Sequence, residues 1–115
     1  MSQFITLRIG AAMTTSYRVN KEKILTEEYQ DQDLLPICET FDRSTIEDIL
    51  SQEGCAKVRI YYGMDDDYKV HAIMVGVSED GQDMLPSGDD DANSQIAENA
   101  QRCPTICPPS SPLNS

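Results

Sequence analysis

The sequence predicts a small α+β domain, in which helices pack on an antiparallel sheet. One segment alternates apolar and polar residues as a β-hairpin does, and two other segments show the spacing of amphipathic helices. A chain of 115 residues is long enough for one domain with a modest core. We expect residues 1–101 to form this domain, with a mobile acidic loop at about 87–94, and residues 102–115 to form a tail rich in proline and cysteine.

The hairpin is predicted over residues 56–77. Apolar residues alternate with polar or small ones over Ala56–Met64, which is typical of a strand with one buried face. The run Asp65–Asp67 then supplies side chains that accept hydrogen bonds from their own backbone in a turn. The second strand is apolar on both faces over Ile73–Val77, so we expect it to lie in the centre of the sheet or under cover.

A first helix is predicted near the N-terminus. Ile9, Met13 and Tyr17 recur at four-residue spacing, and Thr6 is a suitable N-cap. The helix should therefore run over about 7–20.

A second helix is predicted over about 42–52. Ile46, Ile49 and Leu50 make its buried stripe. Asp42 or Ser44 is the N-cap, and Glu47 lies three residues after Ser44, as a capping box requires. This helix leads directly into the first strand of the hairpin.

The remaining segments show weaker patterns. Residues 21–29 either continue the first helix or form another, and residues 30–39 form an irregular connection because Pro36 disfavours helical angles before it. After the hairpin we expect a turn, a short strand at 84–85 and a short helix at 94–100.

The charge of the chain is strongly negative, at -11, and unevenly distributed. Residues 1–64 hold ten acidic and seven basic side chains, whereas residues 65–115 hold ten acidic side chains and only Lys69 and Arg102 as basic ones. Such a field repels phosphate backbones and anionic lipids, which argues against nucleic-acid and membrane-surface binding. A basic protein partner is compatible with it, as is a charge that serves solubility alone.

The sequence predicts a cytoplasmic protein. No stretch approaches the ~18 apolar residues of a membrane span. The apolar patch near the N-terminus has no positively charged region ahead of it, unlike a secretory signal. We therefore expect the four cysteines to be thiols or metal ligands.

Cys103 and Cys107 form the sharpest candidate site. Their C-x3-C spacing is one residue longer than that of thioredoxin-like sites, which argues against catalytic redox chemistry. Zinc or another soft metal would need further ligands, with Cys55 first and Cys38 or His71 as additional possibilities. A disulfide across the short loop is a further alternative, and the favoured interpretation is a proline-stiffened tail whose small cysteines pack on the domain.

No catalytic constellation is present in the sequence. His71 is the only histidine, and there is no GxSxG, GxxxxGK or GxGxxG motif. Asp89, Asp91 and Asn93 have alternate spacing, but the glycine and glutamate of an EF-hand loop are absent. We expect neither an enzyme nor a bound cofactor.

Five residues are candidates for contact with a partner protein. Aromatic rings gather near the hairpin tip, where they either pack in the core or anchor a partner. The tail carries two large apolar residues among four of the six prolines, and we expect it to dock beside the hairpin or between the hairpin and the first helix. The candidates are Tyr61, Tyr62, Tyr68, Ile106 and Leu113.

Four segments carry a resemblance to a known family: ITLRIGAAMTTSYR, LLPICETFD, SQEGCAKVRIYYGMDDDYKVHAIMVGVSEDGQDML and QRCPTICPPSSPLN. Together they resemble a family of small uncharacterised bacterial proteins, which have an RIYxG strand, a VGVDxxGxD strand and a C-terminal CPPxC segment. The sequence departs from this pattern at Ser78 and Thr105. The resemblance implies a single complete domain with a cysteine-containing tail, and it implies no activity.

The function expected from these observations is that of a non-enzymatic cytoplasmic binding or accessory protein, which acts through protein–protein contacts. The alternative is a thiol or metal-binding protein that acts through the segment from Cys103 to Cys107.

Overall fold

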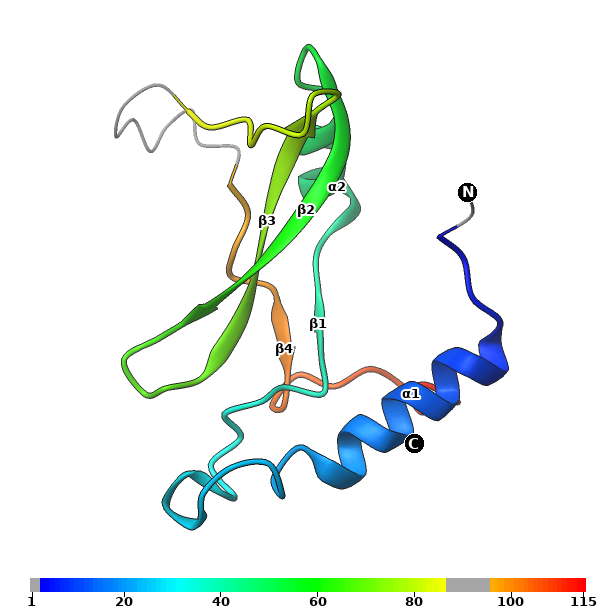
Figure 1. Ribbon diagram of the computed structural model, residues 1–115, viewed down its shortest axis with the longest axis vertical. Coiled ribbons are helices and arrows are strands. Elements are labelled where there is room, and N and C mark those ends of the chain that lie inside the picture. Colours follow the sequence, from blue (N-terminus) through cyan, green and yellow to red (C-terminus); the bar gives the residue numbers. More distant parts are fainter. Residues whose placement is uncertain (1–2, 87–95) are drawn as a thin grey trace.

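The computed structural model describes residues 3–86 and 96–115, and it confirms the α+β fold (Figure 1). It has two small antiparallel sheets, where the sequence predicted only the one built on the hairpin. The acidic loop predicted at about 87–94 lies outside the described residues. The elements in chain order are α1 (Leu7–Asn20), a 3-10 turn η1 (Glu27–Tyr29), β1 (Cys38–Thr40), α2 (Arg43–Leu50), β2 (Cys55–Met64), β3 (Val70–Ser78) and β4 (Gln101–Cys103).

The hairpin of β2 and β3 is confirmed. The two strands pair antiparallel from Met64 opposite Val70 at the tip to the far end, where one irregularity lies just after Cys55. At the tip, Asp65 Oδ1 accepts hydrogen bonds from the backbone N–H groups of Asp67 and Lys69, at 2.9 and 3.0 Å. The aspartate run therefore closes the turn through its own backbone, as its composition predicts.

Strand β3 lies under cover on both edges, as its two apolar faces predict. One edge pairs with β2, and alternate residues of the other edge form backbone hydrogen bonds with segments from distant parts of the chain. From the tip outward, the bonded pairs are Val70 with Leu34, Met74 with Ala97 in both directions, Gly76 with Met84, and Ser78 with Gln82. Strand β2 is consequently the outer strand of the hairpin, with its other edge unpaired among the described residues.

The core lies between α2 and β3. Ile49 of α2 is only 2% exposed and packs against Met74 and Ala97. Gly76 permits this close approach, because a Cβ atom there would lie 2.9 Å from the side chain of Gln52 and 3.3 Å from that of Ile49. Ile46 and Ile49 of the predicted stripe therefore pack on the core, whereas Leu50, predicted to be buried with them, is 47% exposed.

The predicted capping box of α2 does not form. The helix begins at Arg43, so Asp42, one of the two predicted residues, is the N-cap, and Ser44 lies within the first turn. The carboxylate of Glu47 is paired with Arg43 instead, four residues earlier on the exposed surface. An ion pair at helical spacing has replaced the expected bond to the backbone.

Helix α1 has the predicted bounds and cap, with Thr6 Oγ1 accepting a hydrogen bond from the N–H of Ile9 at 3.2 Å. None of its residues is buried, and Met13 of the apolar stripe is 63% exposed. The periodicity of the stripe thus identifies the helix correctly but not a buried face.

The C-terminal half of α1 contacts the connection before β1 and the end of the tail. Tyr17 Oη donates to the carbonyl of Pro36 at 2.6 Å, and Arg18 donates to the carbonyls of Leu113 and Ser115 at 2.5 and 2.7 Å. The chain end accordingly lies beside α1 in Figure 1. These contacts place the last residues of the tail on α1.

The segments around the two helices differ from the prediction. Residues 21–25 form turns and η1 follows, so residues 21–29 neither continue α1 nor form a second α-helix. The irregular connection is confirmed, but it ends in β1, which the sequence pattern did not predict. A strand of three residues is too short to show alternation in the sequence. Strand β1 forms through its pairing with β4.

Two short elements predicted after the hairpin are absent from the described residues. Residues 84–85 form no strand, although the N–H of Met84 donates to Gly76. Residues 96–100 are not helical, because the backbone of Ala97 exchanges two hydrogen bonds of 2.8 Å with Met74. The backbone hydrogen bonds that Ala97 forms with the edge of β3 stabilise this segment more than its weak helix propensity would.

Candidate functional site

The two sheets are joined by a pair of side chains on the β1–β4 ladder. Glu39 and Arg102 are cross-strand partners, and both reach the edge of β3. The carboxylate of Glu39 accepts a hydrogen bond from the N–H of Ala72, and its side chain is only 7% exposed. Arg102 donates to the carbonyl of Val70 at 3.2 Å and to the carbonyls of residues 33 and 34 at 2.7 and 3.0 Å. The side chains of Glu39 and Arg102 thus form hydrogen bonds with backbone groups on the edge of β3, which another strand would bind in a larger sheet.

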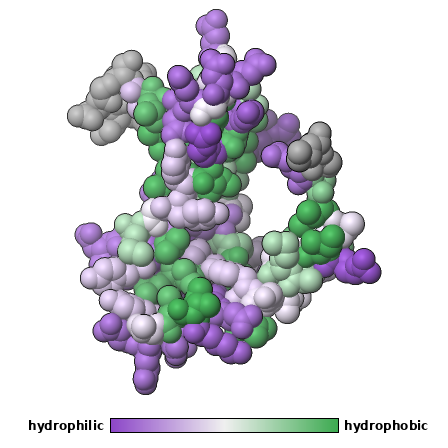
Figure 2. Space-filling view, viewed as in Figure 1, coloured by the Kyte–Doolittle hydropathy of each residue, from purple (hydrophilic) through white to green (hydrophobic). Residues whose placement is uncertain are grey.

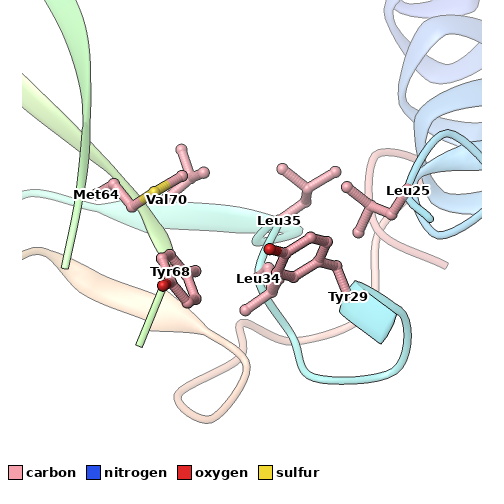
Figure 3. A pocket seen from close by; sticks show the side chains of 7 residues that line it. All are labelled: Leu25, Tyr29, Leu34, Leu35, Met64, Tyr68 and Val70. Atoms are coloured by element: carbon pink, nitrogen blue, oxygen red, sulfur yellow. The ribbon is translucent and has the colours of Figure 1, made fainter. Parts of the chain in front are cut away.

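This attachment leaves a groove between the hairpin tip and the segment that leads to β1. The groove consists of two cavities of about 280 and 380 Å³, which share Leu35 and Val70. Figure 3 shows the first cavity, with the hairpin residues Met64, Tyr68 and Val70 facing the residues from η1 and its flanks. Because tyrosines line both cavities, we call it the tyrosine groove. Its tyrosines are Tyr17, Tyr29, Tyr62 and Tyr68.

Tyr68 adopts an unfavourable backbone conformation at the edge of this groove. Its φ of +65° lies in the left-handed region, which side chains other than glycine rarely adopt. The ring meets that of Tyr29 edge to face, with the centroids 5.9 Å apart. A strained backbone conformation persists only where the surrounding structure holds it, and such conformations are enriched at functional sites.

Two of the three hairpin tyrosines predicted as partner contacts therefore line the groove. Tyr62 is 79% exposed there, and Tyr68 is also exposed. Tyr61 points to the other face of the sheet, where its hydroxyl donates a hydrogen bond to the carboxylate of Asp83. Arg59 donates to the same carboxylate, with 2.6 Å between its Nη1 and Oδ1 of Asp83. These bonds, with that of Tyr61 the larger cause, hold the pKa of Asp83 below its ordinary value.

Acidic residues flank the groove-lining residues in the sequence, and Glu39 lines the groove itself. Residues 22–33 contain five carboxylates and one basic residue, and Asp65–Asp67 lie at the opposite hairpin turn. Figure 2 shows apolar surface bordered by hydrophilic surface on this part of the molecule. Among these acidic residues, Glu22 accepts hydrogen bonds from the side chain of Lys21 and from the backbone N–H of Asp31, and these bonds lower its pKa.

His71 lies among carboxylates rather than beside a nucleophile. Its Nε2 donates to Asp65 at 2.8 Å, and its Nδ1 lies 3.3 Å from Glu39 and 3.9 Å from Glu98. The neighbouring cavity, of about 240 Å³, has no serine or cysteine among its described lining residues. The arrangement links the hairpin turn to β1 electrostatically.

The contact between His71 and Asp65 predicts a defined pH dependence of stability. His71 first, and then the backbone N–H groups of Lys69 and Asp67, hold the pKa of Asp65 below its ordinary value. A carboxylate with a lowered pKa stabilises the fold fully above the unfolded pKa of about 4, and this contribution is lost as the pH falls through the folded pKa.

We expect Asp65→Asn to lower the urea midpoint at about pH 6, and the difference from the wild type to shrink steadily below about pH 4. Asp66→Asn removes the same charge from the neighbouring position and serves as the control. A difference for Asp65→Asn that stays constant down to about pH 2.5 would contradict the role given to its ionised form.

The cysteines of the tail form a disulfide between Cys103 and Cys107. The N–H of Ile106 donates to the carbonyl of Arg102 at 2.9 Å, and this turn brings the two Cα atoms to 4.6 Å. The expectation of thiols is thus wrong for this pair, and the disulfide alternative is the one observed. Cys38 and Cys55 remain free thiols, as expected.

The candidate metal ligands are not gathered at one place. Cys103 and Cys107 are disulfide-bonded, whereas Cys55 begins β2 near α2, away from β4 in Figure 1. In the part of the chain that the structure describes, no three His, Cys, Asp or Glu side chains are arranged to hold a metal ion. Cys38, which the sequence offered only as an additional ligand, is instead the residue opposite Cys103.

The two apolar candidates of the tail lie outside the groove. Ile106 and Leu113 are both about half exposed, and neither lines the groove's cavities. Leu113 lies next to Gly10 of α1, with 3.6 Å between its side chain and the position of a Cβ atom there. The tail therefore supplies no described residue to the tyrosine groove.

Among the residues described, no helix has the combination of length and apolar character that crossing a membrane requires. Comparisons of the chain with protein-family models, with curated proteins and with solved structures found no match. The case for a function therefore rests on the site itself.

Proposed function

We propose that this protein is a non-enzymatic binding or accessory protein, and that its tyrosine groove takes a short segment of a partner protein. The observation that carries the proposal is an open apolar groove lined by exposed Tyr62, Met64 and Tyr68. Exposed aromatic residues around a concave apolar surface are typical of protein-binding sites.

The chemistry of the groove defines the segment that fits it. Each of the two neighbouring cavities is large enough for an apolar side chain, which favours a peptide that places one side chain in each. Glu39 in the groove and the carboxylates next to the lining residues in the sequence favour lysine or arginine beside those side chains. We therefore propose a partner segment with an aromatic or aliphatic anchor and basic neighbours.

We place this activity in the cytoplasm. Reducing conditions there would keep Cys38 and Cys55 as thiols, as they are in the structure. A cytoplasmic disulfide such as that of the tail would then be a reactive bond rather than a permanent one.

A selection from short random peptides on the immobilised full-length chain tests the groove. Enriched peptides should carry an apolar anchor with basic neighbours, and their binding, measured by fluorescence polarisation, should weaken as salt is raised. Tyr62→Glu should weaken binding roughly 30-fold, since an aromatic anchor contributes about 2 kcal/mol.

Leu85→Glu is the matched control, because Leu85 is also exposed and lies outside the groove. Binding to this variant should stay within about twofold of the wild type. Selected peptides that bind Tyr62→Glu as well as the wild type, or a selection without any enrichment, would overturn the proposal.

A second candidate function is that of a thiol protein. The disulfide in the tail and the position of Cys38 opposite Cys103 favour it. Metal binding through the same segment would first require reduction, because zinc binds thiolates.

A further inference from the structure

A free cysteine lies opposite a disulfide-bonded one where β1 pairs with β4. Cys38 is the direct cross-strand partner of Cys103, and Cys103 is bonded to Cys107. In an antiparallel pair, opposite residues point to the same face of the ladder. The neighbouring pair, Glu39 and Arg102, points towards β3, so Cys38 and Cys103 share the other face.

We propose that Cys38, Cys103 and Cys107 form a thiol–disulfide exchange site. The Cys38 thiolate attacks Sγ of Cys103, a bond forms between these two sulfurs, and the bond from Cys103 to Cys107 breaks. The electron pair leaves on Cys107, which takes up a proton equivalent to the one that Cys38 gave to solvent. One disulfide replaces another, so the step needs no oxidant or reductant.

The geometry keeps the attacking and attacked residues close. Opposite residues of an antiparallel pair have Cβ atoms about 4.5–5.5 Å apart, and a disulfide needs about 3.5–4.5 Å, so a shift of about 1 Å is enough. The N–H of Ile37 donates to the carbonyl of Cys103 at 2.8 Å, and Arg102 is held by three carbonyls. The register is thus fixed on both sides of the cysteine pair.

Burial determines which sulfur each thiol can reach. Cys103 is 2% exposed, so an attack on it must come from within the fold, and Cys38 is the half-buried thiol across the ladder. Cys107 is exposed, and with Cys103 it lines a cleft of about 260 Å³ beside Pro108. Exchange would therefore release a thiol at the surface, where it can form a mixed disulfide with a small thiol compound or a partner cysteine.

The product also changes the tail. The new bond joins β1 to β4, while the loop from Pro104 to Ile106 is no longer closed by a disulfide. This inference is independent of the tyrosine groove, because no residue of the exchange site lines its cavities.

Peptide mapping of the full-length chain under non-reducing conditions tests the site. The protein is held without oxygen or added thiol at a series of pH values, quenched with acid, alkylated at low pH and cleaved with trypsin. We expect peptide 24–43 to be joined to peptide 103–115 through Cys103, with Cys107 alkylated. The rate should rise with pH, because the thiolate is the attacking form.

Cys38→Ser should abolish both the joined peptide and the alkylation of Cys107, whereas Cys55→Ser should change neither. Cys55 is an equally half-buried free thiol, but it contacts the carbonyl of Lys57 on the hairpin. A wild type that keeps only the original disulfide up to about pH 9 would overturn the proposal. Joining of peptides through Cys55 at a similar yield would overturn it as well, because unfolded chains exchange without selectivity.

Discussion

Replacing Arg102 with methionine is expected to lower the free energy of unfolding by roughly 2–4 kcal/mol. The guanidinium donates to the carbonyls of Val70, Asp33 and Leu34, and it joins the β1–β4 ladder to the hairpin. Methionine keeps most of the apolar stem but leaves these carbonyls without their donor. Urea unfolding followed by circular dichroism measures the change.

Arg43→Met is the matched control, because the side chain of Arg43 is 91% exposed and pairs with Glu47 on the surface of α2. Its effect should stay within about 0.5 kcal/mol, as for other surface substitutions. Equal midpoints for the two variants would show that Arg102 does not hold the sheets together. Arg102→Lys should recover only part of the loss, since one ammonium group cannot reproduce the planar fork that reaches three carbonyls.

Truncating Ile49 to alanine is expected to cost about 2–5 kcal/mol, the usual range for a buried aliphatic side chain. Ile49 fills the space between α2 and the strand residues Met74 and Gly76, and the absence of a side chain at Gly76 leaves nothing to replace it. A loss of this size should lower the melting temperature by roughly 10 °C or more, since about 1 kcal/mol moves the midpoint of such a domain by 4–8 °C.

Leu50→Ala removes the same number of carbon atoms one position later, where the side chain is 47% exposed. It should shift the midpoint by only a few degrees, roughly a third of the effect at Ile49. A larger effect at Leu50 than at Ile49 would mean that α2 is rotated from the orientation described here.

The elements that could be predicted are those whose pattern is long enough to be unambiguous. The hairpin of β2 and β3 extends over alternating residues on both strands, and the central position of β3 follows from its two apolar faces. Helix α1 was identified from its stripe and from the cap at Thr6. These signals are local, and each repeats several times within one element.

The groove was only partly predictable. Tyr62 and Tyr68 were candidates because aromatic residues gathered near the hairpin tip, but Tyr61 lies one residue from Tyr62 and so points to the other face. The facing wall comes largely from residues 25–37, for which the sequence predicts part of a helix and then an irregular connection. Composition alone does not indicate which loop covers which strand face.

Local pattern was therefore sufficient for the two main helices, the hairpin and its turn, because backbone hydrogen bonds and apolar periodicity within one segment specify them. Only the tertiary structure revealed the β1–β4 ladder, with Cys38 opposite Cys103, and the bonds of Glu39 and Arg102 to β3. The same holds for the non-helical course of residues 96–100. Each of these joins residues that are far apart in sequence. Such contacts form because unpaired backbone groups on the edge of β3 must find partners, and whichever segments the fold brings near supply them.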